Sequence, residues 1–284
     1  MNNFIRVTQY GTEKEAIDHM VYVPHGDTDV VEFLSKIPES HGVYDAFSAE
    51  ELTRYNRMEV DIGTPEVAHS LGKLLQERHP EKSTVVVEAL CPRNFLDMNR
   101  YADQTVKHTF DAEKYPEYHA ALLDIYNQVI AVVERFMARS TITFHVHSMC
   151  PNNLHKWPEI TPHLNQFCKE FIAIKNQSTR RKTDVFWRDE NKVEILQKQY
   201  VDQMIAALQR RNIPYDIDKP YAYLSYGIMH KQSQLWDSIA IDIVKSDMCT
   251  NGPEDFHDPS ALIIDPKKAE VFAQVLYETY YPPA

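Results

Sequence analysis

The segment TITFHVHSMCP, residues 141–151, places two imidazole groups two residues apart. In an extended chain, side chains alternate between the two faces, so His145 and His147 point one way and Phe144 and Val146 the other. Imidazole is the commonest metal ligand in proteins, so the pair suggests part of a metal site. Two polar residues on the exposed face of a half-buried strand would show the same pattern. Other segments must therefore supply the remaining ligands.

Polar side chains that can do chemistry also follow other short apolar runs. His25 comes after VYVP, the acids Glu59 and Asp61 lie in MEVDIGT, and arginines lie in CPRNFLDMNR. Two histidines and one carboxylate, with a fourth position left for water, are a ligand set of catalytic zinc hydrolases. The residue types therefore indicate metal-assisted hydrolysis.

Each of these residues also has a plainer interpretation. His25 would cap a turn, and Asp61 would cap a helix that begins at Thr64. Arg93 or Arg100 would form an ion pair at the surface. Sequence patterns alone leave both interpretations open.

The elements that must position these residues alternate between short apolar runs and longer amphipathic ones, which is typical of an α/β domain. Strands are expected at 20–24, 84–88, from 141 and at 238–244, with a further apolar segment at 221–225. Helices are expected from 48, from 64 and at about 117–138, 164–174, 191–211 and 266–280. Ser48 and Glu51 have the spacing of a capping box. Without repeats or linkers, residues 1–284 are predicted to form one domain, in which ligands bind where the strands end.

Composition narrows the classes of partner. The formal net charge of −11 disfavours nucleic acids and anionic membranes, which need a basic footprint. The run Arg180, Arg181 and Lys182 is too short for one, and a solvated loop is favoured over a rim that recruits an acidic substrate. Neither a nucleic acid nor an anionic membrane is therefore the expected partner.

The four cysteines have no CxxC pairing, so neither a disulfide framework nor a thiolate zinc site is indicated. We also find no apolar run long enough for a signal peptide or a membrane span, and we expect a cytoplasmic protein. The motifs GxGxxG, GxxxxGKS/T, GxSxG and HExxH are absent, which disfavours the commonest nucleotide-binding, serine-hydrolase and zincin sites.

Four segments, taken in order, resemble the N-formylglutamate amidohydrolase family. The family pattern has Pro-His-Ala/Ser-Gly, then Leu-Thr-Arg-His followed by Asp-Ile-Gly, then Ser-Arg-Leu-x-x-Asp-x-Asn-Arg, then His-Ser-Phe-Thr-Pro. This sequence has VPHGD at 23–27, LTRYNRMEVDIG at 52–63, PRNFLDMNR at 92–100 and HSMCP at 147–151. RxxxDxNR is the most specific piece, and DKPYAY at 218–223 resembles the family's Asn-x-Pro-Tyr element. The resemblance covers most of the chain and implies a mixed β-sheet flanked by helices, as in zinc carboxypeptidases.

Carried over residue by residue, the resemblance implies that His25, Asp61 and His147 bind one zinc ion per chain. Glu59 remains the alternative carboxylate ligand. His145 becomes a neighbour on the same face as His147.

The arginine segment contributes the substrate-binding groups that the resemblance implies. Arg93 is similar to the arginine that polarises the scissile carbonyl, and Asn99 and Arg100 to the pair that binds a substrate carboxylate. Asp97 would orient one of these groups or pair with one arginine, and an ion pair that merely holds the loop is the plainer interpretation. Tyr221 matches the tyrosine of the Asn-x-Pro-Tyr element.

The general base is where this sequence departs from the family pattern. The family has Glu-x-Arg-x-Asp, whereas AIDIVKSDM places Lys245 and Asp247 at the last two positions and Ile243 at the glutamate. Asp242 lies one residue earlier, and such a shift turns a side chain to the other face unless a bulge restores its direction. We predict Asp242 as the base, with Asp247 as the second candidate.

The resemblance implies a zinc-dependent amidohydrolase that cleaves a small N-acyl amino acid such as N-formyl-L-glutamate, and thus a small-molecule substrate that carries a carboxylate. The alternatives are a metallo-carboxypeptidase or peptide amidase on the same scaffold, and a metal-free carboxylate-binding protein, which the missing glutamate favours. A cysteine hydrolase built on Cys150 is a weaker alternative, because no oxyanion motif accompanies it.

Overall fold

The computed structural model of the 284-residue chain describes residues 4–26, 29–37, 48–106, 113, 115–149, 181–219, 223, 227–251 and 262–283. The predicted helix 164–174 and most of the segment 221–225 lie outside these residues.

Seven strands in the described part of the chain form one sheet in the order β1, β3, β2, β4, β7, β5, β6. Their bounds are β1 Ile5–Gly11, β2 Ile17–Val23, β3 Ser83–Ala89, β4 Ser140–Met149, β5 Thr183–Val185, β6 Tyr215–Ile217 and β7 Ser238–Val244. β3, β2, β4 and β7 run parallel to one another. β1 is antiparallel to β3, and β5 is antiparallel to β7. The predicted α/β fold with a mixed sheet flanked by helices is confirmed.

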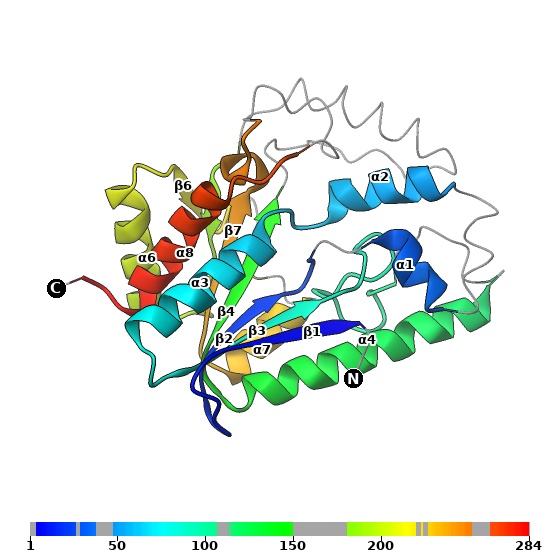
Figure 1. Cartoon of the computed structure of the whole chain (residues 1–284), viewed down its shortest axis with the longest axis horizontal. Helices are drawn as coiled ribbons and strands as arrows, with labels where there is room; N and C mark the ends of the chain where they lie inside the picture. Colours follow the sequence, from blue (N-terminus) through cyan, green and yellow to red (C-terminus); the bar gives the residue numbers. More distant parts are fainter. Residues whose placement is uncertain are drawn as a thin grey trace.

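Helices cover both faces of this sheet (Figure 1). One face carries α3 Thr64–Arg78, α6 Lys198–Arg210 and α8 Pro266–Tyr280. The other carries α1 Val30–Ser35, α2 Ala49–Glu59, α4 Pro116–Met137 and α7 Ile228–Leu235. None of the helices in the described ranges is long and apolar enough to span a bilayer.

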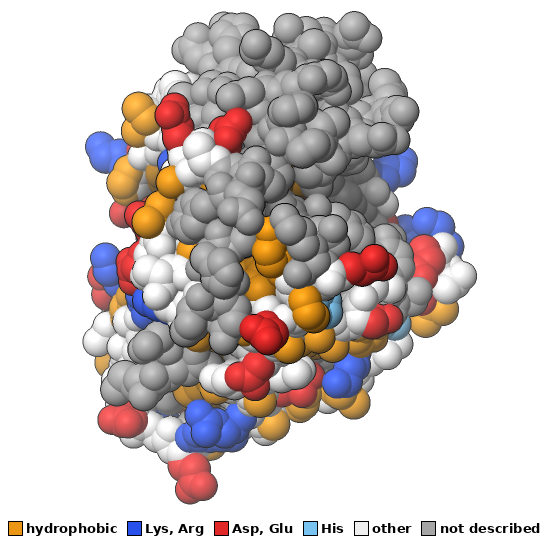
Figure 2. All heavy atoms as spheres, turned by 90° about the vertical axis from the view of Figure 1, so that its right-hand side faces the viewer, with side chains coloured by type: hydrophobic (Ala, Val, Ile, Leu, Met, Phe, Trp, Pro, Cys, Tyr) orange, Lys and Arg blue, Asp and Glu red, His pale blue; other side chains and the backbone are white. Residues whose placement is uncertain are grey.

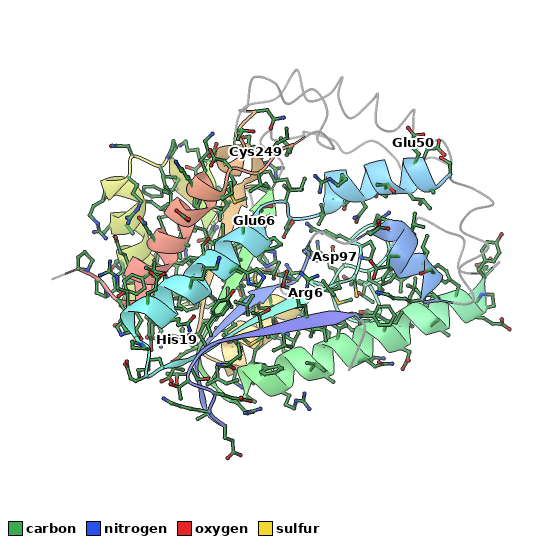
Figure 3. All side chains as sticks on the ribbon, viewed as in Figure 1. Arg6, His19, Glu50, Glu66, Asp97 and Cys249 are labelled. Carbon is green, nitrogen blue, oxygen red and sulfur yellow. The ribbon has the colours of Figure 1, made fainter. Side chains whose placement is uncertain are left out.

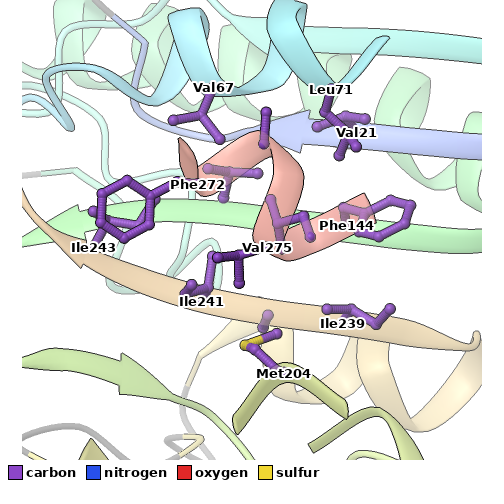
Figure 4. Packing of buried hydrophobic residues seen from close by; sticks show 14 of the residues in the cluster. Val21, Val67, Leu71, Phe144, Met204, Ile239, Ile241, Ile243, Phe272 and Val275 are labelled. Atoms are coloured by element: carbon purple, nitrogen blue, oxygen red, sulfur yellow. The ribbon is translucent and has the colours of Figure 1, made fainter. Parts of the chain in front are cut away.

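The central strands are buried on both faces, which explains their continuous apolar, β-branched sequences. On the α3 face, Val21, Phe144 and Ile241 from three neighbouring strands pack against Leu71 of α3 and Val275 of α8 (Figure 4). This packing fixes the three strands against the two helices. On the face shown in Figure 2, Lys and Arg side chains of the described residues are scattered among Asp and Glu.

Local sequence signals set several helix starts. The predicted capping box is confirmed at α2, where Glu51 N–H donates to Ser48 Oγ at 3.2 Å and Ser48 N–H donates to Glu51 Oε2 at 2.9 Å. Proline occupies the first turn of α3, α4 and α8, where its missing N–H costs no hydrogen bond.

The prediction of a helix over 191–211 is wrong at its start, because α6 begins at Lys198. Asp189 Oδ1 accepts hydrogen bonds from Asn191 N–H at 2.8 Å and Val193 N–H at 2.9 Å, and Lys192 has a φ of 68°. These contacts form a turn that excludes the helix. The strands β1, β5 and β6 and the helices α1 and α7 were not predicted. β5, β6, α1 and α7 are short, and β1 is an edge strand with a mixed sequence.

The order of the strands fixes where a ligand binds. From β2 the chain passes through α1, α2 and α3 to β3 on one side, and then through α4 to β4 on the other side. The direction of winding thus reverses at β2, and ligands of open α/β sheets bind at the carboxyl ends of the strands at such a point. His25 follows β2, and His147 lies near the end of β4.

Candidate metal centre

The loop after α2 is tied to the ends of both strands at the switch point. Asp61 N–H donates to the carbonyl oxygen of His25 at 2.9 Å. The hydroxyl of Ser148 donates to the carbonyl oxygen of Ile62 at 3.0 Å, a contact that no sequence pattern predicts. These two hydrogen bonds bring Asp61 between His25 and the end of β4.

Gly63 allows this loop to turn into α3. It is the N-cap residue of α3 with a φ of 89°, a conformation that favours glycine. Because that N-cap makes no side-chain hydrogen bond, Asp61 does not cap the helix, and its carboxylate faces other partners.

The side chain of Asp61 joins two of the predicted site residues. Its Oδ2 lies 3.2 Å from His147 Nδ1, and its Oδ1 accepts a hydrogen bond from Arg93 Nη1 at 3.1 Å. All three side chains come from different parts of the chain, and the Asp61 carboxylate is fully buried. The interpretation of Arg93 as a surface ion pair is therefore wrong.

His25, Asp61 and His147 each offer one ligand atom, and these three atoms lie within 4.8 Å of one another. Ligands at 2.0–2.1 Å from a tetrahedral zinc ion are separated by about 3.3 Å, which small side-chain shifts would reach. In the described part of the chain, His25 Nδ1 is buried without a hydrogen-bond partner. Such an orphaned nitrogen suits a metal site, so the residues present fit the predicted ion. Glu59 is not part of this cluster.

The carboxylate of Asp97 contacts the imidazole of His25 at Nε2. Its Oδ1 lies 3.2 Å from His25 Nε2 and accepts the backbone N–H of Asn99 at 3.0 Å, while its Oδ2 lies 3.5 Å from Arg93 Nε. Figure 3 shows Asp97 at the end of the sheet covered by α1 and α2, with His19 at the opposite end. Asp97 thus contacts both His25 and Arg93, and a carboxylate on the outer nitrogen of an imidazole is the kind of contact that orients a metal ligand.

Burial and charge set the protonation of this cluster without a metal. Burial is the main reason that the pKa of His25 falls to about 4, and the charge of Arg93 lowers it further. For Asp61, burial alone would raise the pKa, but the hydrogen bond from His147 and the charge of Arg93 lower it to about 2. A neutral imidazole and an ionised carboxylate are the forms that bind metal ions.

Asp242 lies beside His147 on the neighbouring strand. The β4 and β7 ladder pairs His147 with Asp242 and Ser148 with Ile243 in continuous register, so Asp242 shares the face of His147 without a bulge. Ile243 instead points into the core with Val146. The isoleucine at the family's glutamate position therefore does not reach the site.

The carboxyl group of Asp242 is buried, and its pKa is raised to about 7. Burial is the largest cause, followed by the negative charge of Asp61, whereas the charges of His147, Arg93 and Arg181 oppose the rise. A general base is most effective with a pKa near the working pH. Asp247, the second candidate, is partly exposed on the 3-10 helix Lys245–Met248 after β7.

Two solved proteins have an architecture similar to that of this chain. A gene product of Agrobacterium tumefaciens aligns over 98% of this chain and 95% of its own, with 15% identity and a TM-score of 0.54. N-formylglutamate amidohydrolase from Ralstonia eutropha aligns over 97% of each chain, with 14% identity and a TM-score of 0.50. The chain has an N-formylglutamate amidohydrolase fold. No family model matches the sequence, and no curated protein is similar to it in sequence.

Two of the residues predicted to bind substrate, Asn99 and Arg100, follow Asp97 in the chain, and the backbone N–H of Arg100 donates to the carbonyl oxygen of Asp97 at 3.1 Å. Asn99 Oδ1 accepts the backbone N–H of Met229 at the start of α7, at 3.3 Å. Arg100 Nη1 donates to the carbonyl oxygen of Asn99 at 3.1 Å, and both side chains are partly exposed. Tyr221 lies outside the described residues.

His145 lies on the same face as His147, as predicted, but outside the three-residue cluster. Its ring packs edge-on against Tyr22 with the ring centroids 5.9 Å apart. Burial, and then the charge of His147, lower its pKa to about 3. His145 is therefore a buried neutral neighbour of the cluster.

Proposed function

We propose that this protein is a metal-dependent amidohydrolase that cleaves the amide bond of a small N-acyl amino acid. One observation carries the proposal, namely the buried cluster of His25, Asp61 and His147 with Asp242 as the register neighbour of His147. The shared fold with an N-formylglutamate amidohydrolase supports a hydrolase of this kind.

His25, Asp61 and His147 would hold the ion, for which zinc is the proposed identity because two imidazoles and one carboxylate suit it. When bound, such an ion activates water and polarises a carbonyl oxygen. Asp97 would keep His25 in the tautomer and orientation that ligation needs.

Asp242 and Arg93 would handle the proton transfer and the negative charge of the reaction. Asp242 would accept a proton from the attacking water and deliver it to the leaving nitrogen, since its pKa is about 7. Arg93, held by Asp61 and Asp97, would stabilise negative charge that develops on the carbonyl oxygen. With the proton acceptor present, catalysis is favoured over a metal-free binding role.

The substrate that we propose carries an α-carboxylate, bound by Asn99 and Arg100, whose guanidinium matches a carboxylate in shape and charge. N-formyl-L-glutamate is the first compound to test, because a solved protein of similar fold is named as an N-formylglutamate amidohydrolase.

The test is amine release by purified, zinc-loaded protein from N-formyl and N-acetyl amino acids and from a panel of short peptides. We expect turnover of the N-acyl amino acids, loss of turnover after chelation, and recovery when zinc is returned. Activity that survives chelation would contradict the proposal. Turnover of the peptides alone would indicate a metallo-carboxypeptidase or peptide amidase instead.

A further inference from the structure

A cleft on the α3 side of the sheet lies outside the metal centre. Its volume is about 390 Å³, which falls in the range of small-molecule pockets, roughly 300–1,000 Å³. Side chains from four elements line it, among them Arg6 of β1 and Glu66 of α3 (Figure 3), with others from β3 and α8. None of the described residues that line it is a predicted ligand of the metal. The cleft is therefore a second place where a small molecule can bind.

A chain of hydrogen bonds ends on a buried carboxylate of this cleft, that of Glu88 on β3. Tyr10 Oη lies 2.8 Å from His69 Nδ1, and His69 Nε2 lies 3.1 Å from Glu88 Oε1. Burial, and then the negative charge of Glu88, raise the pKa of Tyr10, so its hydroxyl keeps its proton and donates to His69. A neutral His69 then donates to Glu88 through its other nitrogen. The chain holds the Glu88 carboxylate in place, and that side chain is only 2% exposed.

The second carboxylate oxygen of Glu88 has no partner in the described part of the chain. Oε1 accepts the contact from His69 and lies 3.5 Å from Arg6 Nη1, whereas Oε2 makes no hydrogen bond or ion pair and is not sealed from the cleft. Arg6 contributes little, because its side chain is 57% exposed. A buried carboxylate with one unpaired oxygen is costly unless a positively charged donor meets it. Glu88 thus offers an acceptor to a ligand that carries positive charge.

An ammonium group suits this acceptor better than a metal ion does. Both ring nitrogens of His69 are occupied, by Tyr10 and by Glu88, so His69 has no lone pair left for a metal. Among the described residues, the metal centre is the one group of three ligand atoms within 4.8 Å of one another, and no such group lies in this cleft. Glu66 and Glu270 also line the cleft and add negative charge around an ammonium group.

The outer part of the cleft carries the opposite charge. Lys73 lies two helical turns after Glu66 on α3, is exposed, and makes no ion pair with another described residue. Its ammonium group is thus free to contact a carboxylate. Pro65 and Pro266, from the first turns of α3 and α8, add apolar surface to the lining. A ligand that matches the cleft has an ammonium group, a carboxylate and an apolar side chain.

We propose that this cleft is a binding site for a free α-amino acid with an apolar side chain. The ammonium group of the amino acid contacts Glu88 Oε2, its carboxylate contacts Lys73, and its side chain packs on Pro65 and Pro266. Acidic amino acids are disfavoured, because Glu66 lines the same cleft. The site shares no residue with the proposed amidohydrolase reaction and does not depend on it.

The test is calorimetric titration of the full-length protein with L-leucine, N-acetyl-L-leucine and L-leucinamide, which carry both charges, only the carboxylate and only the ammonium group. L-leucine should bind at least about 10-fold more tightly than N-acetyl-L-leucine, which lacks the group that meets the buried carboxylate. It should bind about 2- to 5-fold more tightly than L-leucinamide, because the lost contact is exposed. Zinc-loaded and chelated protein should give the same result, since no predicted metal ligand lines the cleft.

Glu88→Gln and Lys73→Gln test the two charged contacts. Glu88→Gln should weaken L-leucine binding by about 10- to 100-fold. Lys73→Gln should weaken it by about 2- to 5-fold and leave L-leucinamide binding unchanged, and this exposed variant serves even where Glu88→Gln folds poorly. Glu77→Gln, at an exposed position of α3 outside the cleft, is the matched control and should bind L-leucine as wild type does. Arg100→Gln, in the proposed substrate site, should also bind it as wild type does.

Absence of L-leucine binding by wild type, equal binding of the three compounds, or binding that requires zinc would overturn the assignment of this cleft. Loss of L-leucine binding in Arg100→Gln, with binding kept in Glu88→Gln and Lys73→Gln, would also overturn it and place the ligand in the proposed substrate site. Absence of turnover with N-acyl amino acids, combined with binding of L-leucine that depends on Glu88 and Lys73, would overturn the proposed function and support the cleft.

Discussion

Asp61 and His147 lie 86 positions apart in the sequence, and Asp61 Oδ2 and His147 Nδ1 are 3.2 Å apart. This separation suits a hydrogen bond in the metal-free protein and is also close to the spacing of two ligands on a tetrahedral ion. The same pair can therefore hold its geometry before and after a metal binds. Preorganisation of this kind lowers the cost of binding.

Replacing a predicted ligand should remove the metal. His25→Ala and His147→Ala are each expected to lose stoichiometric zinc, because two remaining ligands hold the ion weakly. His145→Ala, the matched control from the same face of β4, should retain it. Elemental analysis of the purified variants measures the difference, and zinc kept by His147→Ala but lost by His145→Ala would shift the motif by two residues.

Asp97→Asn should weaken metal binding without abolishing it. Its Oδ1 lies 3.2 Å from His25 Nε2, and loss of such a supporting carboxylate typically costs 10- to 100-fold in metal affinity. Competition with a chelator of known affinity measures the change. An unchanged dissociation constant for zinc would show that Asp97 stabilises only its loop and the position of Arg93.

Asp242→Asn should lower kcat by about 10²- to 10⁴-fold while zinc remains bound, because it removes the proposed proton acceptor. Asp247→Asn is the control, since Asp247 is partly exposed on the 3-10 helix. Its kcat should stay within a few fold of wild type. The reverse ranking in steady-state kinetics would assign the base to Asp247.

Gly63→Ala should destabilise the protein by about 1–2 kcal/mol, because the φ of 89° disfavours a residue with a Cβ atom. The new Cβ would also lie 2.7 Å from Met248 Cε, which has to move. At Gly26 the nearest atom would be 3.5 Å away, so Gly26→Ala should change stability by less than about 1 kcal/mol. Urea unfolding compares the two, and equal losses would contradict the role of the Gly63 turn.

His19 should make the metal-free protein less stable in mild acid. Burial is the main cause that lowers its pKa to about 4, whereas an unfolded chain protonates it near pH 6.5. The unfolded state therefore binds more protons between these values, so stability is present above about pH 6.5 and is lost as the pH falls toward 4. We expect His19 to contribute about 2 kcal/mol to the loss between pH 7.5 and 5.

The measurement for His19 is urea unfolding of chelated wild type and His19→Gln at both pH values. The variant should lose less stability on acidification, because its side chain does not titrate. Parallel losses in the two proteins would show that His19 does not drive the change.

The sequence by itself determined which residues could do chemistry and roughly where each would lie. Apolar runs with strand and helix periods placed β7 and α8 at their observed bounds, and the short runs located β2, β3 and β4. Polar residues that follow such runs, His25 and His147 among them, were expected at one edge of the sheet, since parallel strands end together. These features depend on the spacing of apolar and polar residues along the chain, which can be read directly from the sequence.

Tertiary structure decided which of the candidates meet. The hydrogen bonds at His25 and Ser148 select Asp61 over Glu59, and the register of β4 with β7 turns Asp242 toward His147. The inward position of Arg181, beside an exposed Lys182, also became visible only in the fold. Distances between residues far apart in sequence depend on crossovers, register and burial, and local sequence patterns do not contain these quantities.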